Sequence, residues 1–170
     1  MKIFLTSLRL FLCLTLLTGI AYPLFITFIA QGRVNLNLIA QKFEKPIYFW
    51  PRPSAIDYHP LPSGGSNLGP TSRLLKETVE IRKIELAKAH GVPIENVPAE
   101  LVYASGSGLD PHISRAAAYF QMDRVARARG VDQMRIEKLV NSLMENHPPR
   151  INVLLLNRAL DQLQGGNRDE

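Results

Sequence analysis

Four residues that could carry acyl-transfer chemistry lie in one short stretch of this sequence: Ser105, Ser107, Asp110 and His112. A serine nucleophile needs a histidine base to accept its proton and a carboxylate to orient the far nitrogen of that histidine. Such groups usually come from separated elements of a fold, and the stretch lacks the G-x-S-x-G turn between a strand and a helix. A membrane-anchored envelope hydrolase using a serine of the SGSG segment is therefore the alternative interpretation, not the leading one.

The same stretch offers little for binding phosphate or metal. Its SGSG segment, 105–108, could form a backbone nest for an anion, but no lysine follows it as in a P-loop. Asp110 and His112 are two candidate metal ligands, whereas a zinc site takes at least about three from the protein. We prefer to interpret His112 as a residue that hydrogen-bonds its own loop before a helix. The sequence therefore predicts no catalytic residue, no metal ligand and no cofactor site of its own.

Two loops rich in Gly and Ser, 63–72 and 104–114, share this composition. Gly supplies positive φ, Asp and Ser bond nearby backbone, and Pro fixes the chain direction, so a structural role explains each residue type. Ordered loops with few apolar side chains also form recognition surfaces. The candidates for contacting a partner or ordering the loops are Ser63, Gly64, Gly65, Ser66, Asn67, Gly69, Ser105, Gly106, Ser107, Gly108, Asp110 and His112.

An uncharged, apolar run at 10–30 is long enough to cross a bilayer as one helix. Thr15 and Gly19 contribute small residues to a strip where another helix could pack closely, and Pro23 removes a backbone donor and predicts a kink. The threonines of the run are expected to hydrogen-bond to the preceding turn. A signal peptide cleaved after Ala21 would give a secreted soluble binding protein, but its apolar core would span only about 7–15 residues. We expect an uncleaved span.

The expected organisation is a short cytoplasmic N-terminus at 1–9, a transmembrane helix at 10–30, an extracytoplasmic domain at 31–164 and a flexible tail at 165–170. Lys and Arg are nearly balanced across the span, so they do not decide its orientation. An N-terminal segment of nine residues is readily left in the cytoplasm. We therefore expect the C-terminal domain to lie outside.

Apolar periodicity and cap residues predict four helices after the span. Their expected caps are Thr71 or Ser72 with Gly91, Ser114 with Gly130, Asp132, and Asn152 with Gly165 and Gly166. Their expected apolar faces are Leu75, Val79, Leu86 and Ala89, then Ile136, Leu139, Val140 and Leu143, then Leu155, Leu156, Ala159, Leu160 and Leu163. Segment 43–55 reads as extended, and 101–105 as a short strand or the approach to one. The fold class is α+β: one N-terminal transmembrane helix and a small, mostly helical domain with a few short strands.

Charge and cysteine content narrow the function classes further. The net charge of +5 comes from Lys and Arg scattered among Asp and Glu, without a basic-aromatic patch, so nucleic-acid binding is not expected. The one cysteine excludes a disulfide within the chain. The domain must therefore be held together by an apolar core or by a partner.

Several motifs occur in an order that resembles one known family. They are "YPLFITFIAQ", "YFWPRPSA", "SGGSNLGPTS", "LVYASGSGLDPHIS" with "AAAYFQMDRVARARG", and "INVLLLNRAL". Together they resemble the C subunit of the Kdp potassium-transporting P-type ATPase, over nearly the whole chain. The sequence departs from the family pattern at Ala40, Glu100, Tyr103 and Arg115, and it is shorter after Gln31 and before Ile151.

The resemblance implies a single-pass protein of the bacterial plasma (inner) membrane with its domain on the outer face. Its implied partners are a channel-like potassium-translocating subunit, the P-type ATPase subunit of the same complex, and membrane lipid. The implied role is that of a non-catalytic accessory subunit in high-affinity, ATP-driven potassium uptake. It would stabilise assembly and act as a catalytic chaperone that raises the ATP affinity of the ATP-hydrolysing subunit. ATP enters as a cofactor only through that pump subunit.

Overall fold

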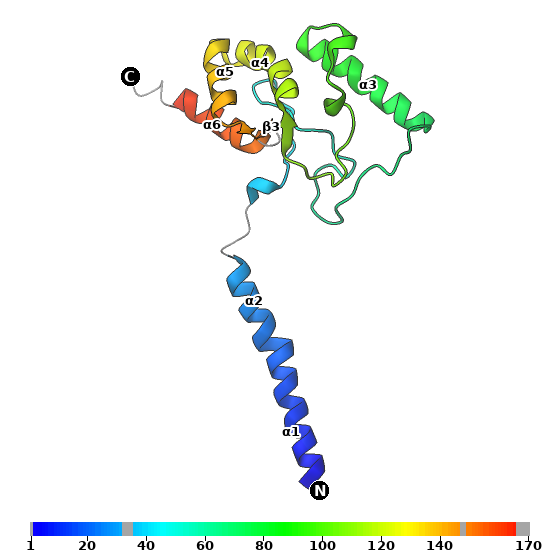
Figure 1. Cartoon of the computed structure of the whole chain (residues 1–170), viewed down its shortest axis with the longest axis vertical. Helices are drawn as coiled ribbons and strands as arrows, with labels where there is room; N and C mark the ends of the chain where they lie inside the picture. The colour runs from blue at the N-terminus through cyan, green and yellow to red at the C-terminus, as the bar shows by residue number, and fades with distance from the viewer. Residues whose placement is uncertain (1, 32–35, 147–148, 166–170) are drawn as a thin grey trace. The chain divides into compact units, whose positions relative to one another are not determined.

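The computed structural model describes residues 2–31, 36–146 and 149–165 of the chain (Figure 1). The chain divides into two compact units, Met1–Leu36 and Asn37–Glu170. Most of the tail expected to be flexible, residues 166–170, lies outside the described residues, as do His147 and Pro148 of the expected helix break.

The first unit is a long helix whose described side chains are exposed along its length. It comprises α1 (Lys2–Leu16), the π-helical turn η1 (Leu17–Ala21) and α2 (Tyr22–Gln31). Residues Lys2–Ala30 are long and apolar enough to cross a membrane. The helix begins at Lys2 and so includes most of the segment expected to form a separate N-terminus. Lipid or partner helices would cover its exposed apolar side chains.

Side-chain hydrogen bonds within this helix confirm the expected role of the threonines. The hydroxyls of Thr15, Thr18 and Thr27 donate to backbone carbonyl oxygens four residues earlier, each at 2.8 Å. Each bond gives a hydroxyl an acceptor within its own helix, which is needed where no water is present.

The π-helical turn lies just before Pro23, where the sequence predicts a kink. The Tyr22 N–H donates to the carbonyl oxygen of Leu17 instead of that of Thr18. Pro23 has no N–H, so it cannot donate to Thr18 in the i→i−5 pattern either. The Thr18 carbonyl oxygen therefore loses both regular helical donors, beside the small residue Gly19.

The described residues of the second unit form four α-helices: α3 (Arg73–His90), α4 (Arg115–Arg129), α5 (Gln133–Ser142) and α6 (Val153–Gly165). The expected N-caps are confirmed, because side-chain oxygens of Ser72, Ser114, Asp132 and Asn152 accept backbone N–H groups of the first turns at 3.0–3.3 Å. Gly91 and Gly130 close α3 and α4 with φ of +69° and +65°. Short 3₁₀ turns form η2 (Leu36–Leu38), η3 (Ile94–Asn96) and η4 (Ala99–Leu101).

A small antiparallel sheet joins distant parts of this unit. Its strands are β1 (His112–Ser114), β2 (Glu145–Asn146) and β3 (Pro149–Asn152), in the order β1-β3-β2. Ile113 is paired with Ile151, and both side chains are buried. Of the two alternatives for 101–105, the short strand is wrong, because Leu101 ends η4 and β3 pairs with 112–114 instead. The segment leads through the second Gly-rich loop toward β1.

The core lies mainly between the sheet and α4, α5 and α6, with α3 at one edge of the unit (Figure 1). A smaller cluster joins α3 to the segment around η4 through Val79, Ala87, Val97 and Val102. Most expected helix faces are confirmed, with three exceptions: Ala89, Leu155 and Leu163 are exposed. Ala87 and Leu154 are buried instead, and Ala87 packs in the same cluster as Val79.

Candidate functional site

The two Gly-rich loops of the sequence lie against each other, backbone to backbone. The Gly64 N–H donates to the Ser107 carbonyl oxygen at 3.0 Å. A Cβ atom on Gly65 would lie 3.0 Å from the Gly106 carbonyl oxygen. Gly108 has φ of +71°, and its Cβ would lie 2.8 Å from the Gly64 carbonyl oxygen. Glycine is required here because any side chain would separate the loops.

Hydrogen bonds fix the second loop from within and to the segments beside it. The Ser107 hydroxyl accepts the Leu109 N–H at 3.1 Å, and the Gly108 N–H donates to the Ser105 carbonyl oxygen at 3.3 Å. The Ser105 N–H donates to the Pro53 carbonyl oxygen at 3.0 Å. These bonds order the loop, which is the structural role that its composition indicates.

The outer part of the first loop makes fewer contacts. Ser63, Ser66, Asn67 and Gly69 are exposed, and a Cβ on Gly69 would meet no atom within 4 Å. Asn67 has φ of +54°, a conformation that Asn tolerates better than most residues. Whether these residues contact a partner stays a prediction.

Asp110 and His112 form a polar cluster beside the loop junction. The Asp110 carboxylate accepts the His112 N–H at 3.0 Å and lies 3.2 Å from the ring Nδ1. It also pairs with the Arg52 guanidinium at 3.3 Å. The other ring nitrogen of His112 lies 3.6 Å from the Glu145 carboxylate. The interpretation of His112 as a residue bonded to its own loop is confirmed.

The same geometry does not assemble an acyl-transfer site. Among the described residues, the ring nitrogens of His112 contact Asp110 and Glu145 but no serine. Ser105 is 3 % exposed, so a substrate cannot reach its hydroxyl. The hydrolase interpretation is not favoured. Nor do His, Cys, Asp and Glu gather in groups of three or more able to hold a metal within the described ranges.

Two side-chain amides hold the segment before the loops in place of strand partners. The Phe49 N–H donates to Asn157 Oδ1, and Asn157 Nδ2 donates back to the Phe49 carbonyl oxygen, both at 2.9 Å. Gln121 does the same for Trp50, accepting its N–H at 2.7 Å and donating to its carbonyl oxygen at 3.0 Å. Asn157 is 1 % and Gln121 0 % exposed. The buried amides therefore satisfy backbone groups that no sheet reaches.

Neither residue of this clamp is among those expected from the sequence to have a structural or functional role. Asn157 and Gln121 are polar residues on otherwise buried helix faces, which is the signal that could have found them.

A buried basic pair lies next to the clamp. Arg124 is 5 % exposed; its Nε donates to His90 Nε2 at 3.0 Å, and its guanidinium lies 3.9 Å from the Trp50 ring centroid. The His90 Nδ1 donates to the Leu86 carbonyl oxygen at 2.8 Å, so the ring is neutral and uses both nitrogens. Burial lowers the pKa of His90 to about 4 and that of Arg124 to about 10. The pair is built for packing rather than for proton transfer near neutral pH.

Comparison with known proteins places this arrangement in a family. The KdpC family, described as "K+-transporting ATPase, c chain", matches residues 4–162. Proteins named potassium-transporting ATPase KdpC subunit are similar over most of the chain. The one from Leptospira interrogans is 46 % identical, covering 91 % of this chain and 91 % of its own length. Those from Sorangium cellulosum and Rhodospirillum rubrum are 46 % and 45 % identical, covering 91 % and 92 % of this chain and 95 % and 93 % of their own lengths. This chain therefore belongs to the KdpC family and is a subunit of a K+-transporting ATPase.

Proposed function

We propose that the chain is a non-catalytic accessory subunit that binds the channel-like subunit and the ATP-hydrolysing P-type subunit of a potassium pump and stabilises their assembly. The observation that supports this most is the extent of the family match, which runs from residue 4 in the membrane-spanning helix to residue 162 in α6. A single long apolar helix at Lys2–Ala30 supplies the anchor in the plasma membrane. The second unit lies outside the cytoplasm in this proposal.

The anchor docks through the face around Gly19. The Thr18 carbonyl oxygen loses both regular helical donors at the π-helical turn, because Tyr22 donates to Leu17 and Pro23 has no N–H. An unpaired carbonyl in lipid costs free energy, so a donor from a partner helix would stabilise the complex. Gly19 has no side chain to keep that helix away.

The second unit acts as a preformed binding module. Buried amide clamps fix the segment around Phe49 and Trp50, and the Gly-rich loops hold each other through backbone contacts. A surface fixed in this way loses little conformational entropy when a partner binds. The exposed outer part of the first loop, with Ser66, Asn67 and Gly69, is the part offered to a partner.

The chain raises the ATP affinity of the pump without binding ATP itself. With its domain outside the cytoplasm, its effect on the ATP site passes through contacts with the other subunits. A subunit that favours the ATP-binding conformation of its partner raises ATP affinity by that differential contact energy.

This proposal is tested by measuring the Michaelis constant for ATP in potassium-stimulated hydrolysis by the pump, assembled with and without the chain. We expect the constant to be at least about threefold higher without the chain, at an unchanged salt concentration. A complex carrying the chain with Ser107→Ala serves as a control for direct chemistry and should match the wild type. An unchanged Michaelis constant in the absence of the chain would contradict the chaperone role.

A further inference from the structure

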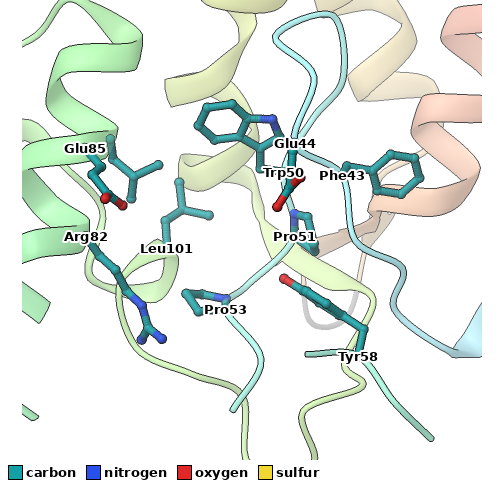
Figure 2. A pocket seen from close by; sticks show the side chains of 10 residues that line it. Phe43, Glu44, Trp50, Pro51, Pro53, Tyr58, Arg82, Glu85 and Leu101 are labelled. Atoms are coloured by element: carbon teal, nitrogen blue, oxygen red, sulfur yellow. The ribbon is translucent and has the colours of Figure 1, made fainter. Parts of the chain in front are cut away.

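A cavity of about 370 Å³ opens between α3 and the segment 43–58 (Figure 2). Trp50, Tyr58 and Phe43 form aromatic walls, and prolines and leucines complete the apolar lining. A cavity of this size and lining is typical of sites for small ligands or single side chains. It belongs neither to the loop junction nor to the membrane span.

Two carboxylates bring negative charge to this apolar cavity. Figure 2 shows Glu44 and Glu85 on opposite sides, with Trp50 between them in this view. Glu44 is paired with Lys42 at 3.1 Å. Glu85 makes neither a hydrogen bond nor an ion pair within the described part of the chain, although it stands in the lining. Glu85 is therefore the carboxylate that can serve a ligand.

The positive charge in the lining is already engaged. Arg82 donates to the Val102 carbonyl oxygen at 2.9 Å. In Figure 2 its guanidinium lies beside Pro53, apart from the carboxylates of Glu44 and Glu85. Its guanidinium is therefore engaged by a backbone oxygen rather than by either carboxylate.

The aromatic walls are fixed in position. The Trp50 ring holds the Arg124 guanidinium 3.9 Å from its centroid, and its remaining surface lines the cavity. The Trp50 Nε1 donates to the Lys45 carbonyl oxygen at 3.1 Å, and the Tyr58 hydroxyl donates to the Arg52 carbonyl oxygen at 2.9 Å. Burial raises the pKa of Tyr58 to about 12, so its ring stays neutral. Aromatic faces attract organic ammonium groups, whereas a bare inorganic cation needs a shell of oxygen ligands. Apolar walls also accommodate an alkyl stem.

We infer that this cavity binds a primary ammonium group on an alkyl stem, with Glu85 as counter-ion and Trp50 and Tyr58 as walls. Two sources share this chemistry: a free alkylamine and a lysine side chain of another subunit. The inference goes beyond the proposed function and does not depend on it, because binding is measured on the chain alone.

Trp50 is the only tryptophan of the chain, so its fluorescence reports directly on the cavity. The purified full chain in an uncharged maltoside detergent is titrated with n-butylammonium chloride, and with KCl at equal ionic strength. We expect a saturable change in Trp50 fluorescence with n-butylammonium and none with KCl. Glu85→Gln should weaken binding about fivefold or more, whereas Glu77→Gln, on the same helix but outside the lining, should leave it unchanged.

A response that does not saturate, that KCl reproduces, or that is equal in the Glu85→Gln chain would overturn the inference. A circular-dichroism melt of each variant confirms that the substitutions leave the fold intact. The same titration on the assembled pump then separates the two sources. If n-butylammonium no longer binds in the pump, a lysine of another subunit is the occupant. If it still binds, the occupant is a free amine. Both outcomes require saturable binding of n-butylammonium to the isolated chain.

Discussion

The Gly64 N–H donates to the Ser107 carbonyl oxygen at 3.0 Å, and this bond joins the two Gly-rich loops of the chain. The loops approach closely enough that their glycines contact each other's backbone. Their unusual composition follows from this contact, because backbone can pack on backbone only where side chains are absent. The chain continues from the junction through Asp110 to His112, the first residue of β1.

Replacing Gly108 by Ala should destabilise the second unit by about 2 kcal/mol or more. The residue has φ of +71°, and its Cβ would lie 2.5 Å from Ile56 Cγ1 and 2.8 Å from the Gly64 carbonyl oxygen. Chemical unfolding of the full chain in detergent, followed by Trp50 fluorescence, measures the change. Gly106→Ala is the matched control, because its Cβ would meet nothing within 4 Å. Equal unfolding midpoints for the two variants would show that the loops do not pack as described.

Asn157→Ala should cost about 3 kcal/mol of unfolding free energy. The change leaves the N–H and the carbonyl oxygen of Phe49 buried without partners, since Asn157 bonds both at 2.9 Å. The unfolding midpoint in urea measures this loss. Gln162→Ala, at an exposed position of the same helix, should change the midpoint little. A loss no larger than that of the control would mean that water or another group satisfies Phe49.

Stability should fall with decreasing pH through the titration of His90. Burial lowers the folded-state pKa of His90 to about 4, below its ordinary value of 6.5. The hydrogen bond to the Leu86 carbonyl and the charge of Asp123 oppose this shift, and the charges of Arg124 and Arg127 add to it. Between these two pKa values the unfolded state binds the proton and the folded state does not. The contribution of His90 to the unfolding free energy is therefore complete above pH 6.5. It decreases as the pH falls toward 4, with a slope approaching about 1.4 kcal/mol per pH unit.

The measurement is a series of urea unfolding curves between pH 4 and pH 7 on the wild type and on His90→Gln. Glutamine keeps an oxygen that can accept the Arg124 N–H but does not titrate. We expect the variant to lose most of the slope that belongs to His90. An identical pH dependence in both proteins would assign the slope to other groups.

A bulky residue in place of Gly19 should weaken the complex in the membrane. Gly19→Ile would place a branched side chain beside the Thr18 carbonyl oxygen and hinder the approach of a partner helix. We expect recovery of the other subunits with the tagged chain to fall about threefold or more. Leu17→Ile lies two positions earlier, on another face of the helix, and should leave recovery unchanged. Equal recovery with both variants would exclude docking through Gly19.

The helix ends could be predicted from the sequence because capping is local. Ser72, Ser114, Asp132 and Asn152 each accept a backbone N–H two or three residues later, so the signal lies within a few residues of each helix start. The threonine bonds of the span follow from helix geometry for the same reason. The buried face of α3 is harder to predict near the end of the helix, where two alanines lie close together and only Ala87, not Ala89, is buried.

The remaining features depend on contacts between distant residues. The strand at His112–Ser114 exists because β3 pairs with it, and the apolar segment 101–105, which looked more like a strand, has no such partner. The sequence revealed two similar loops but not that they pack on each other. The Asn157–Phe49 clamp likewise joins two segments that no local pattern connects.

Affinity purification from membranes shows whether the chain is an anchored subunit of a larger pump. The chain carries a C-terminal tag and is expressed with the other pump subunits, and the eluted proteins are identified by intact mass. We expect the chain to retain residues 1–30 and to elute from detergent-solubilised membranes together with the channel-like and ATP-hydrolysing subunits. A chain shortened at its N-terminus, recovered from the soluble fraction without those subunits, would contradict it.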